Sequence, residues 1–126
     1  MIDPIAIGQT KEYICKEDKV NPTVWIIGSI DSIEQAEILN KVSDKEKDVI
    51  DKNNSSLMLF EIIRFGLKGF KNFKDVQFET ETIKSMDKDR QVVTENIIKM
   101  IPFSIISELA MEIWGSNKIS EAQEKN

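Results

Sequence analysis

The feature that most constrains this chain is the segment 55–67, in which almost every side chain is apolar. A helix that is apolar nearly all round belongs in the centre of a fold or inside an interface. The segment is too short to cross a bilayer, which needs about 20 apolar residues. We expect it to form a central helix that Gly66 and Gly69 end in a left-handed backbone conformation. Its large apolar side chains are Leu57, Met58, Leu59, Phe60, Ile62, Ile63, Phe65 and Leu67.

Two segments before this helix have the pattern of β-strands. Residues 11–15 alternate polar and apolar side chains, with Tyr13 and Cys15 on one face, and residues 23–27 are β-branched and aromatic. The polar stretch between them ends in Asn21-Pro22, which is typical of a turn. The pattern predicts an antiparallel hairpin. A third strand, over residues 76–82, is expected to join it.

Three further helices are predicted. Ser32 and Gln35 have the spacing of a capping box, so a helix should begin there. Apolar side chains at helical spacing predict a second helix from residue 92 to residue 101, which Pro102 ends, and a third from Pro102 to Gly115. The first of these helices should bury Ile33, Ala36, Ile38, Leu39 and Val42 and turn Glu34, Glu37 and Lys41 outward.

The fold class that follows is α+β: a small antiparallel sheet, made of the hairpin and one later strand, packed against three or four helices. With 126 residues the chain fits a single domain, 1–126. Residues 1–9 are apolar but broken by Pro4 and Gly8, so we expect an arm that packs on the body or on a neighbouring molecule. Residues 43–54 are expected to be a charged helix or a loop, and residues 116–126 a short charged tail.

Composition excludes several classes of function. The chain has no histidine and one cysteine, Cys15, so serine and cysteine triads and conventional zinc sites cannot form. It also cannot form an internal disulfide, which indicates a reducing compartment. The net charge of −5 argues against binding to nucleic acid. We see no secretion signal and no run of apolar residues long enough to span a membrane.

The remaining polar clusters are typical of solvated surfaces. Pairs of acids such as Asp87 with Asp89, or Glu108 with Glu112, could divide acid and base roles, but this spacing is common in a chain with 22 acidic residues. Residues 44–51 lack the ligand spacing and central glycine of a calcium loop. Residues 66–69 lack the Lys-Ser/Thr ending of a phosphate loop. We expect no catalytic residue, cofactor or metal.

Aromatic side chains offer binding candidates instead. Phe70 and Phe73 alternate with lysines over residues 68–74, a pattern that could hold a nucleic-acid strand, although acidic residues follow closely. Trp25 lies inside an apolar strand and is expected in the core. Trp114 ends a helix and could be either a core residue or a binding anchor.

Residues 66–75, Gly-Leu-Lys-Gly-Phe-Lys-Asn-Phe-Lys-Asp, resemble the "GLKGW-NF-D" segment of small proteins encoded among the tail genes of tailed bacteriophages. These are described as tail assembly chaperones or as tail-region structural proteins. Residues 21–25 (Asn-Pro-Thr-Val-Trp), 33–38, 101–102, 108–113 and 120–126 fit the same pattern. The chain departs from it in having Phe70 where tryptophan is commoner and a highly charged segment at 43–54.

The resemblance implies a non-catalytic protein that binds tail subunits, such as the tube or tape-measure protein, in the host-cell cytoplasm or in the virion. Its own oligomeric state stays open. The candidate protein-binding residues are Phe65, Leu67, Phe70, Phe73 and Trp114. A second hypothesis is a regulatory or adaptor module that binds a host protein through Phe70 and Phe73. A third is an enzyme that uses the carboxylates of Glu108 and Glu112.

Overall fold

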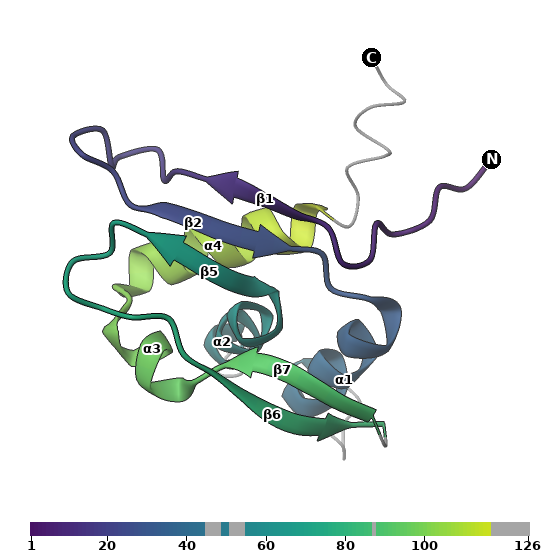
Figure 1. Cartoon of the computed structure of the whole chain (residues 1–126). Helices are drawn as coiled ribbons and strands as arrows, with labels where there is room; N and C mark the ends of the chain where they lie inside the picture. The colour runs from purple at the N-terminus through teal and green to yellow at the C-terminus, as the bar shows by residue number, and fades with distance from the viewer. Residues whose placement is uncertain (45–48, 51–54, 87, 117–126) are drawn as a thin grey trace.

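The computed structural model describes residues 1–44, 49–50, 55–86 and 88–116. In this part of the chain, four helices and three small antiparallel sheets follow one another in the order shown in Figure 1. The helices are α1 (Ser32–Val42), α2 (Ser55–Gly66), α3 (Glu95–Met100) and α4 (Phe103–Ser116). The strands are β1 (Thr10–Tyr13), β2 (Val24–Gly28), β3 (Ser43–Asp44), β4 (Val49–Ile50), β5 (Leu67–Lys71), β6 (Thr80–Ser85) and β7 (Lys88–Val93).

The main sheet has three antiparallel strands in the order β1-β2-β5. Strands β1 and β2 form the predicted hairpin, with Tyr13 opposite Trp25. Trp25 in turn lies opposite Phe70 of β5, so these three side chains share the face that packs on the helices. The predicted α+β class, with a hairpin and one later strand packed against helices, is confirmed.

The third strand of this sheet is β5, and the prediction that residues 76–82 would supply it is wrong. The chain turns directly from α2 into β5, which brings it alongside β2. Gly66 does end α2, but not through a left-handed conformation: among the described residues, Gly8 is the one glycine with a positive φ. A Cβ atom on residue 66 would lie 2.5 Å from Cγ2 of Ile113, so glycine is needed here for close packing of α2 on α4.

Strands β6 and β7 form a separate hairpin, with Thr80 opposite Val93 and Ser85 opposite Lys88. The predicted strand over 76–82 therefore begins later than expected, and it pairs with a strand whose last two residues, Val92 and Val93, were predicted to begin a helix. Val92 and Val93 are buried at the end of β7, and the helix α3 begins only after Thr94. Two adjacent β-branched residues such as Val92 and Val93 are compatible with the pattern of a helix or of a strand. Their hydrogen-bonded pairing with β6 makes them part of a strand.

Helix α1 begins at Ser32, as predicted, but its capping box lies one residue earlier than expected. Asp31, not Ser32, is the capping residue: its Oδ1 accepts from the N–H of Glu34, and Glu34 Oε1 accepts from the N–H of Asp31. The prediction that Glu34 points outward is wrong, because Glu34, Ile38 and Val42 form the buried face of α1. Ile33, Ala36 and Leu39 are exposed instead.

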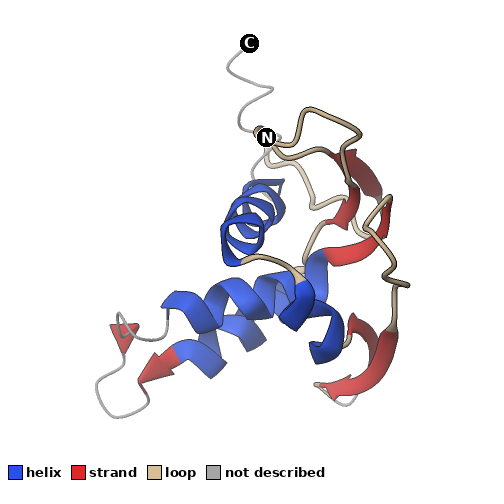
Figure 2. Cartoon of the chain, turned by 90° about the vertical axis from the view of Figure 1, so that its left-hand side faces the viewer, coloured by secondary structure: helices blue, strands red, loops and turns tan. Residues whose placement is uncertain are grey.

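The core lies between the sheets and the helices. Figure 2 shows the helices on one side of the molecule and the strands β1, β2, β5, β6 and β7 on the other. Helix α2 occupies the centre, as predicted, and packs against α1, α3, α4, β5 and β7. Among the described residues, we find no helix of the length and apolar character needed to cross a membrane.

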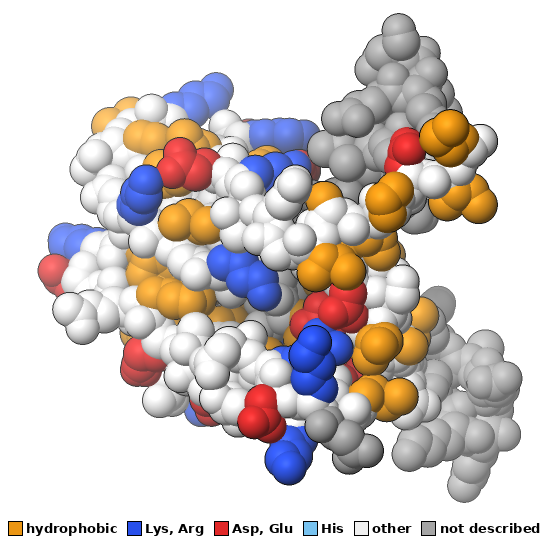
Figure 3. Space-filling model, turned by 45° about the vertical axis from the view of Figure 1, so that its right-hand side comes forward, with side chains coloured by type: hydrophobic (Ala, Val, Ile, Leu, Met, Phe, Trp, Pro, Cys, Tyr) orange, Lys and Arg blue, Asp and Glu red, His pale blue; other side chains and the backbone are white. Residues whose placement is uncertain are grey.

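The ends of the chain and the segment 43–54 are described only in part. Residues 1–9 form an arm without helix or strand, which leaves the body at the start of β1 (Figures 1 and 3). The pair β3–β4 lies within the segment predicted to be a charged helix or a loop. The rest of that segment and the predicted tail beyond residue 116 lie outside the described residues.

Candidate protein-binding surface

Four aromatic side chains, those of Trp25, Phe70, Phe73 and Phe78, pack against one another. The ring centroid of Phe73 lies 5.1 Å from those of both Trp25 and Phe70, and Phe78 lies 5.4 Å from Phe70. Trp25 is buried and the three phenylalanines are half-buried. These four rings close one end of the core, between β5 and the loop that leads to β6. Trp25 is therefore a core residue, as predicted.

Asn72 ties the two segments together. It has a φ of 60°, and its Nδ2 donates to the carbonyl oxygens of Asn21 and Pro22 at 2.8 and 3.1 Å. The hydroxyl of Thr23 donates back to the carbonyl oxygen of Asn72 at 2.8 Å. The residues 21–25 and 66–75, which carry the family resemblance, thus form one structural unit at this end of the sheet.

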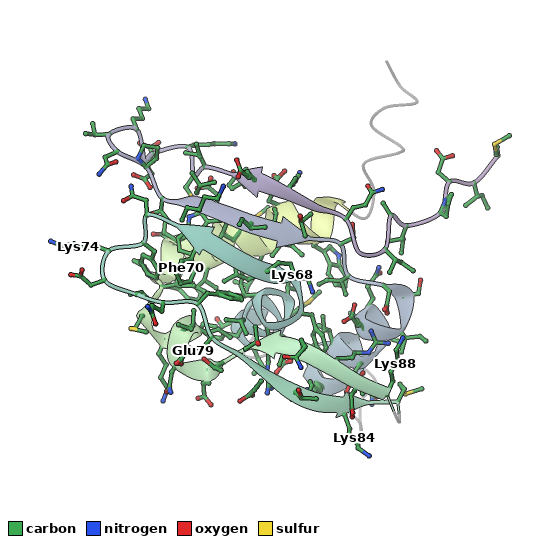
Figure 4. The ribbon with its side chains drawn as sticks, viewed as in Figure 1. Lys68, Phe70, Lys74, Glu79, Lys84 and Lys88 are labelled. Atoms are coloured by element: carbon green, nitrogen blue, oxygen red, sulfur yellow. The ribbon has the colours of Figure 1, made fainter. Side chains whose placement is uncertain are left out.

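The lysines around Phe70 do not form a platform for bases. Lys71 pairs with Glu12 at 2.8 Å, and Lys68 donates to the carbonyl oxygen of Phe65. Figure 4 shows that Lys74 projects from the loop away from the body, whereas Phe70 points inward beneath β5. Because stacking on a nucleic-acid strand needs exposed ring faces, this arrangement does not favour it.

Of the five candidate contact residues, two lie in the core. Phe65 and Leu67 are 1% and 2% exposed, so in this fold they support other side chains and are not available to a partner. Their burial follows from the position of the α2–β5 turn between the sheet and α4. Phe70 and Phe73 are half-buried in the aromatic cluster. Trp114 is half-buried on α4, where it lines a groove together with residues of α2.

The surface of the helical layer carries two apolar grooves, one on each side of α2. The larger, which we call the α2–α3 groove, has a volume of about 680 Å³. The rings of Phe60 and Phe103 meet in it edge to face, with centroids 5.9 Å apart. Leu57 and Phe103 are 43% and 52% exposed at its mouth. It is lined by Leu57, Phe60, Glu61, Arg64, Glu95, Ile98, Lys99, Ile101, Pro102 and Phe103.

The charged residues of the α2–α3 groove are paired in the free protein. Arg64 Nη2 lies 2.8 Å from Glu81, and Lys41 lies 3.5 Å from Glu61. Lys99 and Glu95 are one helical turn apart on α3, at 3.9 Å. Such exposed pairs contribute little to stability and can exchange partners at small cost. The groove therefore combines an apolar floor with a rim that offers both signs of charge.

The smaller groove, which we call the α2–α4 groove, has a volume of about 280 Å³, and none of the described residues that line it is charged. Met111, which is 70% exposed, and Trp114 form its α4 side. Met58, Leu59 and Ile62 of α2 form the other side, with Ala110 and Gly115 completing it.

Sequence reasoning missed Leu57, Phe60, Phe103 and Met111 as surface residues. A signal was present, because a helix that is apolar all round cannot bury every side when its neighbours are short. Met111 also falls outside the helical register of Ile106, Leu109 and Ile113, which are all fully buried. Apolar side chains that do not fall on the buried face of a helix are the ones that remain exposed on its surface.

The acidic pair Glu108 and Glu112 connects α4 to β1. The carboxylate of Glu108 accepts from the hydroxyl of Tyr13 at 2.6 Å and from the N–H of Lys16 at 3.0 Å. The Tyr13 hydrogen bond, opposed by burial and helped by Lys16, holds the pKa of Glu108 below its ordinary value. Glu112 pairs with Lys11 at 2.8 Å. An acid held ionised in this way is poorly placed to donate a proton at neutral pH.

The other acidic candidates give no site in the described part of the chain. Asp87, Asp48 and Asp51 lie outside it, and within it no three carboxylate or cysteine side chains gather in a way that could hold a metal ion. Comparison of the chain with protein-family models, with curated proteins and with solved structures found no match.

Proposed function

We propose that this chain is a non-catalytic protein-binding protein of a tailed bacteriophage, and that it assists tail assembly by holding an apolar segment of a tail subunit. The observation that carries the proposal is the α2–α3 groove, in which Leu57 and Phe103 are about half exposed beside the buried Ile98 and Ile101. The resemblance of residues 66–75 to tail-gene proteins supports the class of partner, such as the tube or tape-measure protein.

The form of the groove favours an amphipathic helix as the bound segment. An apolar floor flanked by charges is the arrangement in which a partner helix buries one face and leaves the other in water. Phe60 and Phe103 are aromatic anchors of the kind that dominate binding energy at interfaces. They project from α2 and α4, whose packing around Gly66 and Ile113 holds them in a defined geometry.

The acidic body suits a protein that covers apolar surface. With a net charge of −5, copies of the chain repel one another, which opposes aggregation of complexes before assembly. Basic residues beside the apolar stripe of a partner would be attracted to the same surface, since Glu61 and Glu95 lie at the groove.

Co-expression tests the proposal. The chain is produced together with tail-tube and tape-measure subunits of a tailed bacteriophage, and complexes are isolated through a tag on the chain. We expect one of these subunits to co-purify in a stable stoichiometric complex. Replacing Leu57 and Phe103 by serine should weaken that complex at least tenfold, because exposed apolar anchors are lost without disturbing the core.

A matched control uses Val20→Ser, which removes an equally apolar and more exposed side chain on the turn between β1 and β2. This variant should bind as the original chain does. If no tail subunit binds, the proposal fails; if binding is unchanged in the Leu57→Ser/Phe103→Ser variant, the α2–α3 groove is not the binding surface.

The alternative is an adaptor that binds a host protein through Phe70 and Phe73. Those rings pack on Trp25 and on each other, which leaves less of their surface for a partner than the groove offers. A single host protein recovered from lysate by the original chain, and lost in a Phe73→Ser variant but not in Leu57→Ser/Phe103→Ser, would favour the adaptor.

A further inference from the structure

The arm formed by residues 1–9 exposes large apolar side chains that the body of the protein does not cover. Met1, Ile2 and Ile7 are 111%, 94% and 73% exposed. Within this segment the N–H of Ile7 donates to the carbonyl oxygen of Ile5, and the N–H of Gln9 donates to that of Ala6, so these hydrogen bonds are local. In Figure 3 the arm projects from the body, with hydrophobic side chains along it. An isoleucine-rich segment in this position has a strong tendency to bind apolar surface.

The arm joins β1 at Gly8. Gly8 has a φ of 82°, a conformation that favours glycine, and a Cβ atom there would meet nothing within 4 Å. The turn at Gly8 therefore lies clear of the packed body. The position of β1 itself is held by its pairing with β2 and by the hydrogen bond that the hydroxyl of Tyr13 donates to Glu108 of α4 at 2.6 Å.

The α2–α4 groove is an apolar surface of matching character at the same end of the molecule. Trp114 and Gly115, which line it, belong to the last turns of α4, and Glu112 beside them holds the strand from which the arm departs. Figure 1 shows this end of α4 near the start of β1. The described residues that line the groove include no charged side chain, and Asp3 is the only charged side chain among residues 1–9.

We propose that two copies of this chain exchange arms, so that the arm of each copy lies in the α2–α4 groove of the other. Within the described part of the chain, each copy carries one arm and one groove with exposed apolar side chains, and a two-fold symmetric dimer makes the same contact twice. Apart from Asp3 and the N-terminal ammonium group of Met1, the described residues of this contact are uncharged, so two chains with a net charge of −5 can meet there without opposing like charges directly.

The second copy, rather than the same chain, is the occupant because the arm leaves the body. The turn at residues 5–7 directs residues 1–4 away from the helices (Figure 1), and Met111 in the groove of the same chain remains 70% exposed. The α2–α3 groove lies on the other side of α2 and stays open in this dimer. The inference therefore does not rest on the proposed function, and either can fail without the other.

Sedimentation velocity of the full chain over a range of micromolar concentrations tests the dimer. We expect a species of twice the chain mass of 14.5 kDa. Two variants should shift it to monomer: Ile2→Ser/Ile7→Ser, which changes only the arm, and Met111→Lys, which changes only the groove. Val20→Lys, a matched change at an exposed apolar residue of the β1–β2 turn, should leave the dimer intact. Circular dichroism should show the same fold in all of them, since the altered side chains are exposed.

Mixing the two monomeric variants distinguishes arm exchange from other modes of dimerisation. The arm variant keeps an intact groove and the groove variant keeps an intact arm, so the mixture can form one of the two contacts. We expect heterodimer to reappear on mixing, with a Kd at least tenfold weaker than that of the original dimer. Three results would each overturn arm exchange: the original chain is a monomer, the dimer survives both changes, or the two variants do not associate on mixing. The last result would indicate that the arm folds onto the groove of its own chain.

Discussion

Gly66 and Ile113 are in such close contact that a Cβ atom on residue 66 would lie 2.5 Å from Cγ2 of Ile113. This contact joins the end of α2 to the last turns of α4 and fixes the spacing between these helices. Both helices contribute side chains to the α2–α3 groove and to the α2–α4 groove. The side chain of Ile113 is fully buried, so it cannot move aside into solvent. The geometry of the candidate surface therefore depends on the absence of a side chain at residue 66.

The change Gly66→Ala should destabilise the protein by about 1–3 kcal/mol, the range for overpacking a well-packed core. Urea denaturation measures the effect as a lower midpoint. Gly115→Ala is the matched control, because a Cβ on residue 115 meets nothing within 4 Å. That change should leave stability unchanged or raise it by up to ~1 kcal/mol through helix propensity. Equal effects of the two changes would contradict the packing explanation.

Arg90 lies 2.8 Å from Asp31 and 3.2 Å from Glu34, and joins β7 to the first turn of α1. Burial alone would raise the pKa of Asp31, but hydrogen bonds from the backbone of Glu34 and from Arg90 outweigh it and lower that pKa. A carboxyl whose pKa is lower in the folded state contributes stability above its unfolded pKa and loses it as the pH falls through the folded value.

Asp31→Asn should therefore cost about 2 kcal/mol at pH 7, the range for a hydrogen bond to a charged group. Asparagine caps helices as well as aspartate does, so the change isolates the charge. The difference between the two proteins should shrink as the pH falls below about 4, where aspartate begins to take up a proton. Urea denaturation at pH 7, 5 and 3 measures it, and a difference that is constant over this range would count against the ion pair.

Asn72 has a left-handed backbone and a side chain bonded to Asn21 and Pro22, and the two roles can be separated. Asn72→Gly keeps the backbone conformation available and removes only the hydrogen bonds, at a cost of about 1 kcal/mol. Asn72→Ala also introduces strain at positive φ and should cost about 1 kcal/mol more. Thermal unfolding should rank the original chain above glycine and glycine above alanine. The reverse order of the two variants would exclude backbone strain at this position.

Cys15 should be inert in the folded protein. It is 2% exposed, and burial, followed by the nearby carboxylates of Glu108 and Asp18, raises the pKa of its thiol to about 11. Since the thiolate is the reactive form, its fraction at pH 8 falls roughly 100-fold relative to an ordinary cysteine. A thiol reagent should react slowly with the native chain and rapidly in urea. Fast reaction of the native chain would show that β1 opens from α4 under native conditions.

Local sequence patterns predicted those parts of the fold in which neighbouring residues all favour the same secondary structure. The alternation over 11–15, the β-branched run at 23–27 and the turn at Asn21-Pro22 suffice to predict the β1–β2 hairpin. Pro102 separates α3 from α4 because proline disfavours a helical residue before it. The central place of α2 follows from its composition alone. Each of these signals acts within a few residues and needs no knowledge of the rest of the chain.

What the tertiary structure decided depends on residues far apart in the sequence. Glu34 is buried because Arg90 reaches it from β7, and Val92 lies in a strand because Glu81 and its neighbours pair with it. Leu67 lies in a strand because the packing of α2 on Ile113 places the residues after α2 beside β2, where they pair with it. The sequence shows that apolar surface exceeds what short helices can cover, but only packing shows which side chains remain outside. Burial and pairing are properties of contacts in space, and a linear pattern specifies them only when the contacting residues are close along the chain.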